Sequence, residues 1–433
     1  MAVKTSDASA NKVRIMQTGD ILLGGAYRSL PEDLASVCRS ALLFGFVNSV
    51  SEEIKTGVSV VLISGNLFDS SSPDPETVDA VIRLFSENPD VDFFITPGER
   101  DFDCPLWESG LLPDNVTVFL SSSVRRVVLQ KKRLEIYGFG VKKKAKSNQP
   151  LADRKVHPST LSKIVTGHCE LNNPISSYFS VTEEEMKGFG ADFYAFSHES
   201  RPYSITRKDG YSYAYTGFFD GRGFDQTGSG GYILITVEEG RHPSESAKTI
   251  NGIKSIHRIS AMNTMNTAIT SNTEKVESDE NTANTATTPN TVNTITAKRR
   301  ETKIHRYESI TVNAQGAKTT LDAETQILDA LRTKKFDMRT SVRAVITGAV
   351  SPEVTITKRP AYIHPSLFSL ECVNETTPTF DCDNLKEDKS ILGEVFRKFY
   401  PDMNSKSRSK RIDAARAFRA AYMALTGKDI NNA

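Results

Sequence analysis

The feature that most constrains the fold is a series of continuous apolar runs, which alternate with helical patterns in the first part of the chain. The apolar runs cover 13–18, 58–65 and 91–98, and helical spacing covers 31–57 and 74–85 between them. A continuous apolar run is typical of a strand that is buried on both faces. The alternation of strands and helices therefore predicts a layered α/β core.

Shorter strand patterns follow, with few helices between them. They include "LEIYGFG", "DFYAFSH" and "GYILITVEEG". Many strands with few crossover helices predict a second sheet rather than one doubly wound sheet. We therefore expect a two-sheet α/β sandwich over residues 1–245, with a smaller C-terminal α+β cap and partner-docking domain over 304–433.

Residues 261–297 break this pattern. The dipeptide Asn-Thr recurs along the segment, aromatic residues are absent and aliphatic residues are sparse. Such a composition cannot bury enough apolar surface to offset the entropy that is lost on ordering. We expect a disordered low-complexity insertion and assign it no function.

The overall charge and the cysteines exclude several classes of protein. The 433 residues carry a net charge of +1, so contact with nucleic acid would need local basic patches, such as the runs at 130–133, 141–146 and 405–411. The five cysteines are scattered and form no CxxC pair, so we expect no disulfide framework and no zinc knuckle. The polar N-terminus, and the absence of a stretch long enough to cross a bilayer, predict a reduced, cytoplasmic protein without membrane contact.

Polar tips follow directly after five of the apolar runs. They read "QTGDILLGG", "ISGNLFD", "TPGERD", "VTGHCEL" and "FSHESRP". Parallel strands bring their carboxyl ends to one edge of a sheet, where ligand sites are commonly built. Carboxylate and imidazole side chains gathered at such an edge are typical ligands of divalent metals.

The order and spacing of these tips resemble those of the calcineurin-like metallophosphoesterases, and within them the SbcD-type DNA repair exonucleases, including the YhaO-type relatives. The resemblance extends to "YTGFFDGRGFDQTGSGGYILITVEEG" at 215–240 and to "DKSILGEVFRKF" with the Arg-rich final helix, so it covers most of the ordered chain. It implies a metallophosphoesterase-like sandwich. It also implies a site for two divalent metals, typically manganese, bridged by the aspartate of a Gly-Asp tip.

This sequence departs from the family pattern at most tips. The resemblance implies that five expected residues are kept, namely Asp20, Asp69, Asp101, His168 and His198. Five others are replaced. Leu22 stands for a metal-binding histidine, Asn66 for the bridging aspartate, Glu99 for a metal-binding asparagine, Arg100 for the catalytic histidine, and Ser200 for the final histidine.

The replacements fall unequally on the two implied metals. The first would use Asp20 with positions 22, 66 and 200, so Asp20 remains as the remnant of a lost site. The second would use Asn66, Glu99, His168 and His198, all of which carry a donor atom. We therefore expect either one divalent metal (manganese, zinc or iron) or none.

Several of these residues also have simpler structural interpretations. His168 and His198 fit equally well as structural histidines, Asp20 as a cap of the following turn, and Asp69 and Asp101 as acceptors for local backbone N–H groups. Arg100 cannot act as a proton donor near neutral pH, because its guanidinium stays charged. It can pair with Asp20 or Glu99, or hold a phosphate.

Two functions follow. The first is a weakened or inactive SbcD-type nuclease that serves as a binding module for DNA, through its basic runs, or for an SbcC-type ATPase that docks on the C-terminal helices. The alternative is an active single-metal phosphodiesterase or exonuclease. Whether the chain is still a hydrolase, and whether it forms a homodimer, stay open at this point.

Overall fold

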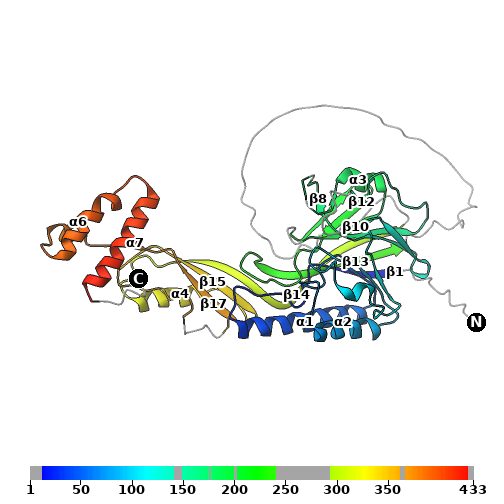
Figure 1. Cartoon of the computed structure of the whole chain (residues 1–433), viewed down its shortest axis with the longest axis horizontal. Helices are drawn as coiled ribbons and strands as arrows, with labels where there is room; N and C mark the ends of the chain where they lie inside the picture. The colour runs from blue at the N-terminus through cyan, green and yellow to red at the C-terminus, as the bar shows by residue number, and fades with distance from the viewer. Residues whose placement is uncertain are drawn as a thin grey trace, which may run out of the picture.

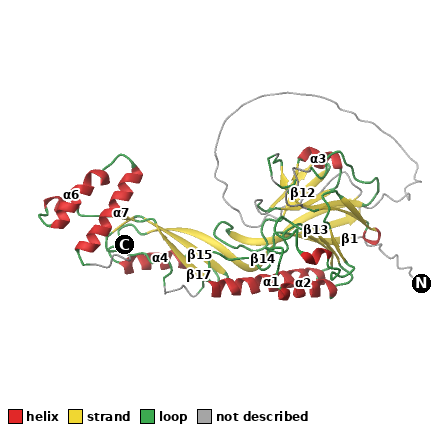
Figure 2. Cartoon of the chain, viewed as in Figure 1, coloured by secondary structure: helices red, strands yellow, loops and turns green. Residues whose placement is uncertain are grey.

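The computed structural model describes residues 12–140, 149–173, 175–176, 178–198, 202–239, 293–360 and 366–427. Within these ranges the chain forms two large sheets with helices on their outer faces, and it ends in a helical region far from the sandwich (Figures 1 and 2). The two-sheet α/β sandwich expected from the sequence is confirmed.

The first sheet has eight strands in the order β17-β15-β14-β13-β1-β2-β3-β4. Strands β1 to β4 run parallel to one another, whereas β13 is antiparallel to both of its neighbours, β1 and β14. The strands span β1 Lys12–Thr18, β2 Val58–Ile63, β3 Asp92–Ile95, β4 Val116–Val118, β13 Gly228–Glu239, β14 Asn293–Asn313, β15 Thr340–Thr347 and β17 Ser369–Asn374.

The second sheet has six strands in the order β11-β12-β10-β7-β6-β5, and its four central strands are parallel. They span β5 Arg125–Leu129, β6 Leu134–Phe139, β7 Ser162–His168, β10 Phe193–Ser197, β11 Ser204–Lys208 and β12 Tyr211–Tyr215. Two short pairs complete the strands, β8 Glu170–Leu171 with β9 Ser180–Val181 and β16 Ala349–Val350 with β18 Thr377–Pro378.

The helices cover the outer faces of the sandwich and form the C-terminal end. Helices α1 and α2 lie along the outer face of the first sheet, and α3 covers the second (Figure 2). The helices span α1 Glu32–Lys55, α2 Pro75–Ser86, α3 Glu183–Phe189, α4 Thr320–Arg332, α5 Cys382–Glu387, α6 Ile391–Met403 and α7 Arg408–Leu425, with 3-10 turns at Pro105–Glu108 and Gln130–Lys132.

Strand β2 shows why the apolar runs are continuous. Val60 and Leu62 point into the core between the two sheets, whereas Val61 and Ile63 pack on the other face against helix residues such as Phe46. Both faces of the strand are therefore dry. This favours apolar side chains on both faces of the strand rather than at alternate positions only, and Ser59 is the one polar residue of β2.

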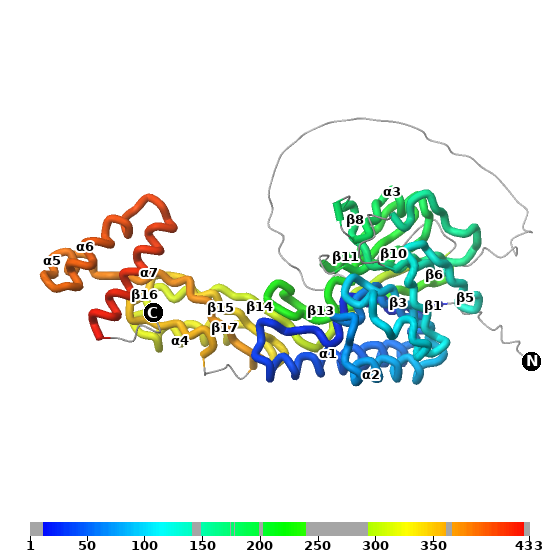
Figure 3. The backbone as a smooth tube through the Cα atoms, viewed as in Figure 1, coloured from blue at the N-terminus to red at the C-terminus, as the bar shows by residue number. Residues whose placement is uncertain are grey.

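Strand β14 joins the sandwich to the C-terminal region (Figure 3). Its first half pairs with β13 and its second half pairs in parallel with β15, so the C-terminal strands continue the first sheet instead of forming a separate one. The strand begins at Asn293, inside the segment 261–297 for which we expected disorder. Ile295 and Ala297 are buried in the inter-sheet core, which accounts for the order at this end. Residues 261–292 lie outside the described ranges, and the expected domain limits remain a prediction.

We expected no stretch long and apolar enough to cross a membrane, but helix α1 is one by length and composition. It is the one helix in the described ranges that meets this criterion, by length and composition only. Its buried residues include Leu42, Phe46 and Val50, which pack under the first sheet. Part of the apolar character therefore belongs to the core of the sandwich.

A buried histidine marks the point where β14 meets β15. A hydrogen bond of 3.1 Å joins His305 Nε2 to Ser341 Oγ, and the imidazole packs edge-on against Tyr307 and Phe368. Burial lowers the pKa of His305 from its ordinary value of 6.5 to about 4. The neutral form is therefore the one that the fold accepts.

This pKa predicts a loss of stability in mild acid. Below pH 6.5 the unfolded chain binds a proton at His305 that the folded chain refuses until about pH 4, so the contribution present above pH 6.5 is lost as the pH falls through this window. We expect His305→Gln to reduce the drop in unfolding free energy between pH 7 and pH 5 by roughly 2 kcal/mol, measured by chemical denaturation. His157→Gln, which changes an exposed histidine, is the control and should behave as the wild type. Equal drops in the wild type and His305→Gln would contradict the prediction.

Candidate metal centre

The polar tips of the two sheets meet at one edge of the sandwich. Strands β1, β2 and β3 of the first sheet, and β7 and β10 of the second, end at this edge. Buried polar contacts hold the two sheets together just below it. Gln17 Nε2 donates to the carbonyl oxygens of Phe196 and Ala214, and Ser64 Oγ lies 3.0 Å from Thr166 Oγ1. The strand ends are therefore fixed relative to one another before any ligand is present.

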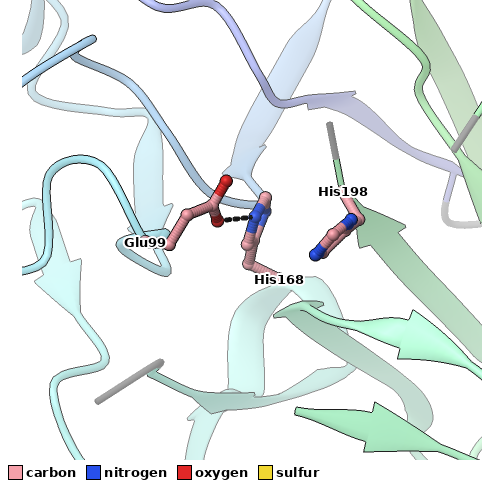
Figure 4. A group of neighbouring side chains, drawn as sticks. All are labelled: Glu99, His168 and His198. Atoms are coloured by element: carbon pink, nitrogen blue, oxygen red, sulfur yellow. Dashed lines mark ion pairs between the residues drawn. The ribbon is translucent and has the colours of Figure 1, made fainter. Parts of the chain in front are cut away.

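Three of the expected ligands lie together in this edge. The side chains of Glu99, His168 and His198 point toward one another, and their ligand atoms all lie within 4.8 Å (Figure 4). Glu99 Oε2 forms an ion pair of 2.5 Å with His168 Nε2, and the two imidazoles stack with centroids 5.0 Å apart. Both histidines are buried, and Glu99 is partly buried. The sequence thus identified three residues that the fold gathers.

Asn66 also lies in the cluster, but it presents a donor to the centre. Its Nδ2 donates to Asp20 Oδ1 at 2.9 Å and to Glu99 Oε1 at 3.1 Å. Its Oδ1 accepts the backbone N–H of Arg100 at 3.1 Å, which fixes the orientation of the amide. The oxygen that a metal would need faces the backbone of the neighbouring loop. Asn66 is therefore placed as an amide bridge between two carboxylates.

Asp20 is buried inside the site. We expected its carboxylate to cap the following turn, but its carboxylate has other partners. Its carboxylate accepts hydrogen bonds from Asn66 Nδ2 and Ser197 Oγ. Burial raises the pKa of Asp20 to about 6. Leu22, where the resemblance implies a histidine, is buried; its backbone N–H donates to the Asn66 carbonyl, and its carbonyl accepts from Gly25. Position 200, the last member of the implied first site, lies outside the described residues.

His168 supplies the positive charge of the cluster. Burial opposes that charge, but Glu99 and Asp20 outweigh it and raise the pKa of His168 above its ordinary value. For Glu99, burial opposes ionisation and His168 outweighs it, so its pKa falls below the usual range. An imidazolium and an amide thus compensate the two carboxylates from within the protein.

The same geometry fits a single metal ion. His168 Nδ1 lies 3.2 Å from the Ser64 carbonyl, so Nε2 of the neutral ring would face Glu99 and His198, as in metal sites whose second nitrogen is anchored to a carbonyl. Glu99 Oε2 is buried and accepts no hydrogen bond of normal geometry from the described residues. A metal held by Glu99, His168 and His198 would compete with the proton on His168.

Glu170 is a neighbour that the sequence analysis did not select. Its Oε1 lies 3.8 Å from His198 Nε2, and the ring of Tyr178 packs against His198 with centroids 5.4 Å apart. The signal was present in "GHCEL", where Glu170 follows His168 by two residues. It was missed because a carboxylate at that place belongs to no tip of the family pattern.

Arg100 pairs with neither of the partners that we considered. Its Nη1 lies 3.2 Å from Asp69 Oδ1. Asp69 is thus an ion-pair partner rather than an acceptor for turn N–H groups. Asp101 does accept local backbone N–H groups, from Phe68 at 3.1 Å and Gly98 at 2.8 Å, as expected.

The basic runs are partly occupied by intramolecular contacts. In the run 130–133, Lys132 pairs with Asp92 at 2.5 Å and Arg133 with Glu239 at 2.8 Å. In the run 405–411, Arg411 donates to the carbonyls of Ser405 and Lys406 at the start of α7. Residues 141–146 lie outside the described ranges.

Gly65 tests how tightly the cluster is packed. This residue has a φ of +110°, and a Cβ on it would overlap the His168 ring. Gly57 has a similar φ of +98° but nothing within 4 Å of the same position. Gly57→Ala should cost about 1 kcal/mol of unfolding free energy from backbone strain alone. Gly65→Ala should cost about 3 kcal/mol or more, because His168 must also move. Equal losses in urea unfolding would show that His168 is not held as described.

Comparisons with known proteins support this picture at a coarse level. No family model matches the chain. Over 242 residues the chain is 28% identical to the DNA double-strand break repair protein Mre11 of Saccharolobus solfataricus, and the match covers 51% of this chain and 60% of the relative. The chain thus spans about three fifths of that relative's length. Together with the sandwich and the strand-end cluster, this distant similarity suggests a metallophosphoesterase-like fold of the kind found in DNA repair nucleases.

Proposed function

We propose that the chain is a nuclease-like DNA repair protein in which two-metal cleavage is weakened or lost, and which acts in the cytoplasm by binding DNA or an ATPase partner. The observation that carries the proposal is the amide of Asn66, which donates to both Asp20 and Glu99. A bridging ligand must accept metal ions on both sides, and a donor cannot do so. The centre that would clamp the attacking and leaving oxygens is therefore replaced by hydrogen bonds.

The position of the catalytic histidine supports the same conclusion. Arg100 carries a permanently charged guanidinium, which cannot deliver a proton to a leaving group near neutral pH. Its guanidinium pairs with Asp69 at 3.2 Å, and among the described residues it forms no ion pair with Asp20 or Glu99. Cleavage would therefore lack both the ligand that bridges two metal ions and the histidine that protonates the leaving group.

The C-terminal helices are the candidate surface for an SbcC-type ATPase or a second copy of the chain. Helices α6 and α7 pack on each other through Phe396 and Phe418, whose ring centroids are 5.1 Å apart. Ile391 and Leu425 remain exposed on the same two helices. Exposed aliphatic residues on a helical pair that lies far from the sandwich (Figure 1) are suited to docking another helical protein.

Reversal of the charge exchange tests this proposal. Asn66→Asp with Glu99→Asn restores the family residues at two positions, and we expect no gain of manganese-dependent exonuclease activity on linear duplex DNA. The reason is that Leu22, Arg100 and Ser200 still lack the donors of the first metal and the acid. The control is the variant that also carries Leu22→His, Arg100→His and Ser200→His. In this variant all five replaced positions carry the residue that the family pattern implies. Cleavage by the double variant, or cleavage by the wild type that His168→Ala abolishes, would overturn the proposal.

A second candidate function is an active phosphodiesterase or exonuclease with one metal. The gathering of Glu99, His168 and His198 within 4.8 Å favours it, since one metal can polarise a phosphate and activate water. It predicts about one equivalent of manganese, zinc or iron per chain after expression in metal-supplemented medium, by elemental analysis. His168→Ala should lose the metal and His157→Ala should keep it. Protein that holds no transition metal under these conditions would exclude the single-metal enzyme.

A further inference from the structure

A polar cavity of about 430 Å³ lies beside the candidate metal centre and is lined by four arginines. One of its lining residues, Arg100, follows the cluster residue Glu99 directly in the sequence. Its charged lining residues come from five separate segments of the chain, and they are Arg28, Asp69, Arg100, Arg222, Asp225 and Arg343. Four guanidinium groups line this wall with two carboxylates, and Glu371 pairs with Arg343 from outside the lining, so one positive charge remains in excess among these residues.

Two of the arginines are held in place by one carboxylate. Asp69 Oδ1 lies 2.8 Å from Arg222 Nη1 and 3.2 Å from Arg100 Nη1. The backbone approaches Arg222 closely, because a Cβ on Gly25 would lie 2.8 Å from its Nη1. The Arg222 side chain is only 13% exposed. These two guanidinium groups are therefore oriented in advance and partly removed from water, which strengthens their attraction for an anion.

Arg343 is held by other contacts. It lies over the ring of Phe224 at 4.1 Å, and its guanidinium pairs with Glu371 at 3.0 Å. Phe224 in turn packs edge-on against Tyr307, with centroids 4.9 Å apart. Arg343 belongs to β15, so the cavity contains one wall from the C-terminal half of the first sheet.

Arg28 differs from the other three arginines. It is exposed at the cavity, and no carboxylate in the described ranges forms an ion pair with it. An arginine that contributes to a concave, positively charged wall without a carboxylate of its own is available to an anionic ligand. It is also a residue that can be changed without disturbing the ion pairs of Asp69.

The chemistry of the wall selects the ligand. The planar fork of arginine donates two parallel hydrogen bonds and matches the oxygens of phosphate. A phosphate monoester carries up to two negative charges and three terminal oxygens, so several guanidinium groups can share it. An internal phosphodiester carries one charge and two free oxygens, and it matches an excess of positive charge less well.

We propose that this cavity binds a phosphate monoester, through Arg28, Arg100, Arg222 and Arg343. The ligand is the terminal phosphate of a nucleic acid or of a small phosphorylated molecule. The inference goes beyond the proposed function, and it does not depend on cleavage or on a metal, because phosphate binding is measured directly.

The test uses the full chain, with chelator present, and four probes. They are inorganic phosphate, a nucleoside 5′-monophosphate, a 5′-phosphorylated oligonucleotide and the same oligonucleotide with a 5′-hydroxyl, measured by calorimetry and fluorescence anisotropy. We expect the phosphorylated oligonucleotide to bind at least tenfold more tightly than its hydroxyl form, and inorganic phosphate to compete. If the mononucleotide binds as tightly as the phosphorylated oligonucleotide, the ligand is a small phosphorylated molecule. If the mononucleotide binds much more weakly, the ligand is the end of a nucleic acid.

Arg28→Gln should weaken binding of every phosphorylated probe about tenfold with an unchanged thermal midpoint. Arg207→Gln removes an exposed arginine of β11 that lies outside the cavity, and should leave binding unchanged. Equal binding of the phosphorylated and hydroxyl oligonucleotides, or equal losses in the two variants, would overturn the proposal. Failure of inorganic phosphate to compete with the phosphorylated oligonucleotide would also overturn the proposal.

Discussion

The structure depends on a few buried hydrogen bonds that fix the two sheets against each other just below the candidate metal centre. Apolar packing between sheets tolerates sliding, because it has little directional preference. Hydrogen bonds are directional and resist such sliding. Gln17 donates to two carbonyls of the opposite sheet, and Ser64 bonds to Thr166. They set the registration of β1 and β2 over β7 and β10, and so they decide which tips can meet.

Within this frame the cluster balances its carboxylates with groups of the protein itself. A di-metal centre neutralises converging carboxylates with external cations. Here His168 and the amide of Asn66 perform that task, and they arrive with the folded chain. Any metal that enters must compete with a proton for His168, while Asn66 offers it no oxygen. The carboxylates of the cluster are thus compensated by groups of the folded chain.

The fold could be predicted from sequence because β2 and its neighbours are buried on both faces, and strands in that setting carry apolar side chains at most positions. Glu99, His168 and His198 could be selected because the polar tips that follow such runs resemble the metal-binding tips of the calcineurin-like metallophosphoesterases. The orientation of Asn66 could not, since it depends on a backbone N–H of Arg100 in another loop. Nor could the pairing of Asp69 with Arg222, because these residues are 153 positions apart and meet only after the sheets have formed. The start of β14 was missed because a few buried side chains outweigh the composition around them.

Strand β14 carries a consequence for how the two halves of the molecule communicate. It is hydrogen-bonded to β13 at one end and to β15 at the other, so the halves are joined by an unbroken strand within one sheet. Such a connection resists rotation, whereas a flexible linker would absorb it. A force on the C-terminal half would therefore be carried by the strands of this sheet. They include β15, whose residue Arg343 lines the arginine-lined cavity. Partner docking and anion binding would then be linked mechanically, without any moving hinge between them.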